Sequence, residues 1–190
     1  MIIRTEDTPN PNALKLSLDR KILEEHQTVG FNSKGSAFYS PLASALFDLP
    51  GVERVFFGTE FLVVIKSAEC SWDNLKTDIV TIVMDFISTG KSFLNREMNG
   101  SASGFVMEVA PEDEEIVKKI KTLLDNEIRP AVAQDGGDIV FHGYRDGSVY
   151  LRMQGACRGC PSSSLTLKHG VETILRRHLP QIISVEKVEL

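Results

Sequence analysis

Two cysteines separated by two residues are the part of this sequence best suited to chemistry. Cys157 and Cys160 lie in the stretch Gly-Ala-Cys-Arg-Gly-Cys-Pro, residues 155–161. Their spacing lets both sulfur atoms face one point, and Gly159 allows the backbone between them to turn tightly. Pro161 suits the first position of a helix, which predicts Cys160 at or near the N-cap. Unpaired backbone N–H groups there favour negative charge, so the motif predicts a pair of thiolates at a helix start.

Three interpretations of the pair are open on its pattern alone. The cysteines could hold a metal ion or an iron–sulfur cluster, they could form a thiol–disulfide redox pair, or they could have no chemical role. A redox pair is typically found after a strand of a parallel βαβ unit. Here the pair follows a predicted antiparallel hairpin, and Ala156 stands where an aromatic residue would have favoured redox chemistry.

The number of thiols limits what one chain can bind. A tetrahedral Zn²⁺ site or a cubane iron–sulfur cluster takes about four thiolates, but the chain has three cysteines. The third, Cys70, has no ligand-type neighbour at close spacing and is expected to be a bystander. Two chains could complete a site by contributing Cys157 and Cys160 each about a two-fold axis. A cluster held in this way would be labile, which suits a carrier better than an electron-transfer centre.

The elements around the pair belong to an α+β fold. In the second half, apolar residues that share one helical face predict a helix, and Pro130 is predicted to end it. These residues are Ile116, Ile120, Leu123, Leu124 and Ile128. Strands over 138–144 and 148–154 are joined by Asp146-Gly147, a strong hairpin signal. A helix over 161–179 and a strand over 182–188 follow. The predicted order is α-β-β-α-β, with the C-x-x-C loop between a strand and the N-terminus of a helix.

The chain is predicted to form two small domains. The first, residues 1–94, mixes strands and helices, among them a short helix capped by Ser40 and a hairpin of strands 52–57 and 61–65. Residues 95–110 contain a run of small and polar residues bracketed by glycine and are predicted to be a flexible linker. The cysteine pair lies in the second domain, residues 111–190.

Several segments together resemble a known family. The stretch from Gly155 to Glu172 is similar to the signature of the Nfu family, whose C-terminal domain is of the NifU type. Further matching segments are Arg129-Pro130, Asp135-Gly136-Gly137-Asp138, Thr5 to Asn12, Ser40 to Ala43, Gly51-Val52, Val55 to Gly58, and Met84-Asp85-Phe86. The resemblance covers nearly the whole chain and is far more specific than the C-x-x-C pattern.

The resemblance implies a function without catalysis. Such proteins bind a [4Fe–4S] cluster between two subunits through both cysteines, here Cys157 and Cys160, and form a homodimer when the cluster is bound. They receive the cluster from upstream donors and deliver it to apo iron–sulfur proteins by ligand exchange. The alternatives are a thiol–disulfide oxidoreductase that uses the same cysteines and a dimer held by structural Zn²⁺.

Composition excludes some partners and bears on location. The chain has 21 Lys and Arg against 26 Asp and Glu, a net charge of −5, which gives no electrostatic reason to expect nucleic acid. No apolar run approaches the roughly 20 residues that span a bilayer. Few cysteines indicate a reducing compartment. The first residues resemble neither a signal nor a transit peptide, so the sequence favours a bacterial cytoplasm, with a processed mitochondrial matrix protein as the alternative.

Other polar residues are expected to have structural or surface roles. The four histidines lack cysteine or carboxylate partners at the sequence spacing that ligands of one metal ion usually have. They are His26, His142, His169 and His178. The segment from Asp135 to Asp138 lacks the pattern of a nucleotide-binding loop, so it is interpreted as a turn.

Overall fold

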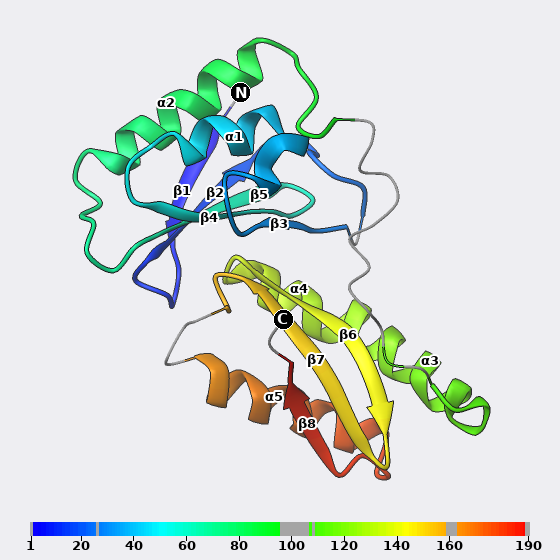
Figure 1. Cartoon of the computed structure of the whole chain (residues 1–190). Helices are drawn as coiled ribbons and strands as arrows, with labels where there is room; N and C mark the ends of the chain where they lie inside the picture. Colours follow the sequence, from blue (N-terminus) through cyan, green and yellow to red (C-terminus); the bar gives the residue numbers. More distant parts are fainter. Residues whose placement is uncertain (1, 26, 96–106, 108, 159–162, 189–190) are drawn as a thin grey trace. The chain divides into compact units, whose positions relative to one another are not determined.

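The computed structural model describes residues 2–25, 27–95, 107, 109–158 and 163–188. It divides the chain into two compact units, Met1–Ala102 and Ser103–Leu190, each with its own sheet (Figure 1). The predicted α+β class with two small domains is confirmed. Most of the predicted linker falls outside the described residues, so the domain bounds 1–94, 95–110 and 111–190 stay a prediction.

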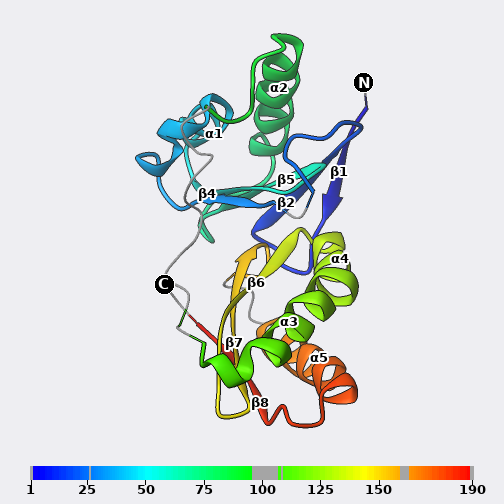
Figure 2. The same ribbon diagram turned by 90° about the vertical axis from the view of Figure 1, so that its right-hand side faces the viewer.

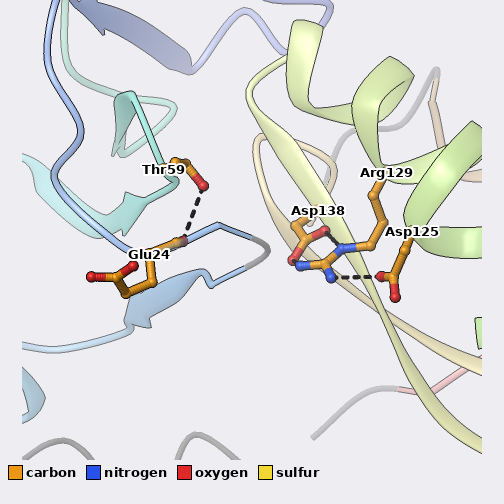
Figure 3. Close-up of polar contacts among 5 residues, drawn as sticks. All are labelled: Glu24, Thr59, Asp125, Arg129 and Asp138. Carbon is orange, nitrogen blue, oxygen red and sulfur yellow. Dashed lines mark hydrogen bonds and ion pairs between the residues drawn. The ribbon is translucent and has the colours of Figure 1, made fainter.

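The first unit is built on a five-stranded antiparallel sheet in the order β1-β2-β5-β4-β3. The strands are β1 (Ile3–Asp7), β2 (Ala13–Leu18), β3 (Val29–Phe31), β4 (Val52–Phe57) and β5 (Phe61–Lys66). The predicted hairpin of β4 and β5 is confirmed by their antiparallel pairing. Its turn is tied to a neighbouring loop by Thr59, whose hydroxyl donates to the Glu24 carbonyl oxygen at 3.3 Å (Figure 3).

Helices cover one face of this sheet (Figure 1). They are a short 3-10 helix η1 (Ser36–Tyr39), α1 (Pro41–Phe47) and α2 (Leu75–Ser88). The predicted cap is confirmed, because the Ser40 hydroxyl accepts from the backbone N–H of Ala43 at 3.1 Å. Leu16 and Leu62 from the sheet and Ile79 from α2 are fully buried in the core between these layers.

The second unit is built on a three-stranded sheet in the order β6-β7-β8. Strands β6 (Gly137–Arg145) and β7 (Ser148–Gly155) are antiparallel, whereas β8 (Ser184–Lys187) is parallel to β7 and follows α5 (Ser163–His178). Asp146 and Gly147 form the predicted hairpin turn, and both have positive φ, as the tightest hairpin turns require. Figure 2 shows the helices of this unit on one side of the sheet.

The long helical segment before β6 does not end at Pro130. After a 3-10 turn η3 (Pro111–Asp113), it runs through α3 (Glu114–Leu123), a wide π-helical turn η4 (Leu124–Ile128) and α4 (Arg129–Gln134). The prediction that proline ends the helix is therefore wrong. Proline lacks an N–H and its ring clashes with the carbonyl four residues earlier. A wide turn directly before it changes the hydrogen-bonding pattern there, and the helix continues.

A single core joins the helices and the sheet of the second unit. Ile120 from α3, Leu151 from β7 and Leu175 from α5 are fully buried in it. Two described residues of the predicted linker also contact this unit. Met107 donates its N–H to the His142 carbonyl oxygen at 2.8 Å, and Val109 packs against the core. No helix in the described ranges is both long and apolar enough to cross a membrane.

Candidate functional site

Cys157 lies two residues beyond the end of β7. The backbone turns directly after the strand, because Gly155 has a φ of 63° and the N–H of Arg158 donates to the Gly155 carbonyl oxygen at 3.1 Å. A positive φ is rare for residues with a side chain, so glycine suits this position. Cys157 is only 4% exposed and belongs to the core of the second unit. Its thiol is therefore packed inward.

The loop that carries Cys157 is attached to the start of β6. The N–H of Ala156 donates to the Gly136 carbonyl oxygen at 3.0 Å, and Gly137 pairs with Gly155 at the end of the β6–β7 ladder. The Cys157 sulfur occupies the place where a side chain on Gly137 would lie, and a methyl group of Val132 also borders that place. Only a residue without a side chain lets the two segments approach this closely.

The start of β6 is in turn held by a buried ion pair. Arg129 donates from Nε and Nη2 to the two carboxylate oxygens of Asp138, at 2.7 and 2.9 Å. Its Nη1 donates to Asp125 at 2.9 Å. Figure 3 shows the guanidinium between the two carboxylates. The Asp138 side chain is 4% exposed, so this charge depends on its partner.

The neighbouring acids keep Arg129 charged. Burial lowers the pKa of Arg129, but the hydrogen bonds and negative charge of Asp138 and Asp125 outweigh burial and raise the pKa above its usual value. The guanidinium is therefore protonated at neutral pH.

Sequence reasoning missed this ion pair, because it interpreted the segment from Asp135 to Asp138 as turn geometry alone. The turn is present, since Gly136 has a φ of 75°. Asp138, however, is the second residue of β6, a strand in which nearly every residue is buried. A carboxylate at such a position needs a cation, and Arg129, nine residues earlier, was the available signal.

Cys160 lies outside the described residues, as do Gly159 and Pro161. Its pairing with Cys157 and its predicted place at a helix N-cap therefore stay predictions. Helix α5 is described from Ser163. Within the described residues, no group of three or more His, Cys, Asp or Glu side chains is arranged to hold a metal ion.

The other candidate residues lie in other segments of the chain. Cys70 belongs to the other unit, has a free, partly exposed thiol, and packs over Gly51. His142 is buried, and His169 is exposed. His178 lies 3.5 Å from a carboxylate oxygen of Glu127.

Models of two protein families match the two halves of the chain. One is described as "Scaffold protein Nfu/NifU N terminal" and matches residues 3–90. The other is described as "NifU-like domain" and matches residues 120–186, the part that contains both cysteines and the ion pair.

Curated relatives match almost the whole chain. The human protein named "NFU1 iron-sulfur cluster scaffold homolog, mitochondrial" is 43% identical over 189 residues, which is 99% of this chain and 72% of the relative. The protein of the same name from Drosophila willistoni is 43% identical over 188 residues, 99% of this chain and 64% of the relative. The chain thus spans about two thirds of the length of these relatives.

One solved structure with a partial match is the solution structure of a NifU-like protein from Saccharomyces cerevisiae. It covers 50% of this chain and 86% of its own, with 24% identity and a TM-score of 0.43.

The names of the curated relatives contradict the predicted location. The sequence favoured a bacterial cytoplasm, but these relatives are named as mitochondrial, which fits the alternative. The prediction was wrong because it relied on the first residues of the chain, and the relatives are longer than the part that matches. Two family models in tandem and 43% identity over 99% of the residues establish that the chain belongs to the Nfu family, with a NifU-like domain after an Nfu/NifU N-terminal domain.

Proposed function

We propose that this protein is an iron–sulfur cluster scaffold that holds a [4Fe–4S] cluster between two subunits. Cys157 and Cys160 of each subunit are its ligands. The observation that carries the proposal is the pair of cysteines two residues apart inside the segment that matches the NifU-like domain. The human relative is named as an iron–sulfur cluster scaffold homologue, which supports the same function.

The count of thiolates supports a site shared between two chains. A [4Fe–4S] cluster takes about four cysteine ligands, and the second unit has two cysteines. The third, Cys70, belongs to the first unit. A two-fold axis that brings together two copies of the loop would supply all four ligands and make the cluster-bound form a homodimer.

Binding must move the loop that carries Cys157. A ligand of a shared cluster has to face the second subunit, but Cys157 is only 4% exposed and its sulfur is packed over Gly137. The thiol must also lose its proton, because the thiolate is the ligand. Loading therefore exchanges the packing of one thiol for a metal–sulfur bond.

Release would follow by ligand exchange. A thiolate of an apo-protein attacks an iron atom of the cluster and replaces Cys157 or Cys160, which leaves as thiolate and takes up a proton. When all four ligands have been exchanged, the cluster has moved to its new protein and the dimer separates. No covalent bond in a substrate is made or broken catalytically, so the protein is a carrier and not an enzyme.

The alternative, a thiol–disulfide oxidoreductase, has less support. An attacking thiol in such an enzyme is typically partly exposed in an electropositive environment, whereas Cys157 is buried in an apolar core. The names of the matching relatives refer to a scaffold.

Anaerobic reconstitution with iron and sulfide tests the proposal. The protein should turn brown and dimerise, with about four iron atoms per two chains. Cys157→Ser and Cys160→Ser should each abolish both the colour and the dimer, and Cys70→Ser is the control that should keep both. A colourless monomer would overturn the proposal, and loss of iron in Cys70→Ser would show that the ligand set is wrong.

A further inference from the structure

Arg129 has the geometry of a residue that holds its partner in one position. The two parallel hydrogen bonds to Asp138 fix both the distance and the plane of the carboxylate. The third bond, to Asp125 on the π-helical turn, orients the guanidinium itself. A lysine could supply the charge but not this fork of donors.

Asp138, the partner of Arg129, is adjacent in sequence to the residue against which the Cys157 thiol packs. Asp138 directly follows Gly137, and Gly137 lies against the Cys157 sulfur. The same space beside Gly137 also borders Val132 of α4, the helix that Arg129 begins. A displacement of Asp138 relative to α4 would therefore change the space that contains the thiol.

Stability alone does not explain why an ion pair occupies this place. Removing two charges from water costs about as much as their attraction returns, so buried pairs contribute little net stability. The same unit contains another arginine pair, in which Arg176 Nη1 lies 2.9 Å from Glu172 and its Nε donates to the Ile182 carbonyl oxygen. That pair ties α5 to the segment that follows it.

We infer that Arg129 is a positioning residue for Cys157. Through Asp138, it holds Gly137 and the Ala156–Gly136 hydrogen bond in place, and thereby keeps the thiol packed until the loop opens to receive a cluster. The inference rests on the proposed role of Cys157 as a ligand. Its test uses the chain without a cluster, so this inference and the proposed function can fail separately.

Alkylation of the three cysteines by iodoacetamide tests the inference in the full chain. Trypsin cleaves after Arg152 and Arg158, so Cys157 falls in the peptide 153–158, Cys160 in 159–168 and Cys70 in 67–76. Mass spectrometry then gives a separate rate for each thiol. Cys70, in the other unit, serves as the internal reference.

The variant Arg129→Lys keeps the charge and removes the fork, and Arg176→Lys is the matched control. Each variant is labelled at the same interval below its own melting temperature, so that global unfolding does not contribute. The Cys157 rate relative to Cys70 should rise about tenfold in Arg129→Lys, because lost hydrogen bonds to a charged group ease local opening. In Arg176→Lys it should change less than about twofold, as for a surface pair.

Asp138→Asn removes the other half of the pair and should raise the Cys157 rate in the same direction. It also keeps the test decisive if Arg129→Lys does not fold. An unchanged Cys157 rate in the variants of the pair that fold would overturn the inference, as would an equal rise in Arg176→Lys. In those cases the pair has a purely structural role, even if the melting temperature falls.

The reconstituted cluster gives a second readout. If Arg129 positions a ligand, the visible circular dichroism spectrum of the cluster should differ between Arg129→Lys and the unmodified protein. The spectrum of Arg176→Lys should match that of the unmodified protein. If neither the unmodified protein nor any variant binds a cluster, the proposed function fails, whereas the alkylation result does not depend on a cluster and still tests the role of Arg129.

Discussion

The sulfur of Cys157 lies against the α-carbon of Gly137, in the space that a side chain at residue 137 would fill. Cys157 lies two residues after the end of β7, and Gly137 is the first residue of β6. The contact joins the candidate ligand loop to the segment held by Arg129 and Asp138.

Replacing Gly137 with alanine should destabilise the second unit. The added methyl group would collide with the Cys157 sulfur and approach a Val132 methyl group at 3.1 Å. Overpacking of this kind typically costs about 1–3 kcal/mol. The free energy of unfolding from urea titration measures the loss. Gly170→Ala is a matched control with the opposite expected sign, because Gly170 lies in α5 with nothing within 4 Å of an added methyl group, and alanine favours a helix. Equal effects of the two substitutions would contradict the packing described.

The two acids that bind Arg129 should differ in their effect on stability. Asp138→Asn should cost about 3 kcal/mol, because it leaves Arg129 without the buried charge that compensates it. Asp125→Asn should cost less than about 0.5 kcal/mol, since the Asp125 side chain is 43% exposed and water can replace it. Urea unfolding of both variants gives the comparison, and similar losses would mean that the partners share the charge equally.

Glu6 should stabilise the first unit at neutral pH and not at low pH. Its carboxylate accepts from the Ser17 hydroxyl at 2.8 Å and lies 3.0 Å from Lys15 Nζ across the β1–β2 pair. The hydrogen bonds from Ser17 and then Lys15 lower the pKa of Glu6 below its usual value of 4.5. The folded state therefore binds this proton less readily than the unfolded state. The resulting stability is fully present above pH 4.5 and is lost as the pH falls through the folded pKa.

The variant Glu6→Gln should accordingly be about 0.5 kcal/mol less stable than the unmodified protein at pH 7, a small value because the pair is partly exposed. The difference should shrink as the pH falls below 4.5. Thermal unfolding at several pH values measures it. A difference that stays constant with pH would show that Glu6 contributes packing and not charge.

Removing residues 1–94 should leave cluster binding intact and slow cluster transfer. Both cysteines and the ion pair belong to the second unit, which has its own core. The first unit is expected to recognise the proteins that receive the cluster. Absorption at reconstitution measures binding, and the activation rate of an apo-protein measures transfer. Unchanged transfer to every apo-protein tested would refute a recognition role.

Local patterns predicted much of the fold. The cap at Ser40 and the turn at Asp146-Gly147 depend on residues next to them in the sequence, and both are present in the structure. Along β7, Val149, Leu151 and Met153 alternate with less buried neighbours, as a strand with one face in the core requires. Such signals are visible in a single sequence because neighbouring residues determine them.

The features that were missed depend on structure beyond the residue that carries the local signal. Pro130 is a strong local signal for a helix end, yet a π-helical turn before it lets the helix continue. The cysteine spacing predicted a ligand at Cys157, but it gave no sign that the thiol packs over Gly137, twenty residues earlier. The buried charge of Asp138 is likewise explained only by Arg129, which the fold places beside it.

Native mass spectrometry of the reconstituted protein distinguishes a cluster shared between two chains from one held by a single chain. A shared cluster gives one dominant species with the mass of two chains and one [4Fe–4S] cluster, which Cys157→Ser and Cys160→Ser abolish and Cys70→Ser retains. A cluster bound to a single chain, or a dimer that keeps its cluster without Cys157 or Cys160, would contradict the proposal.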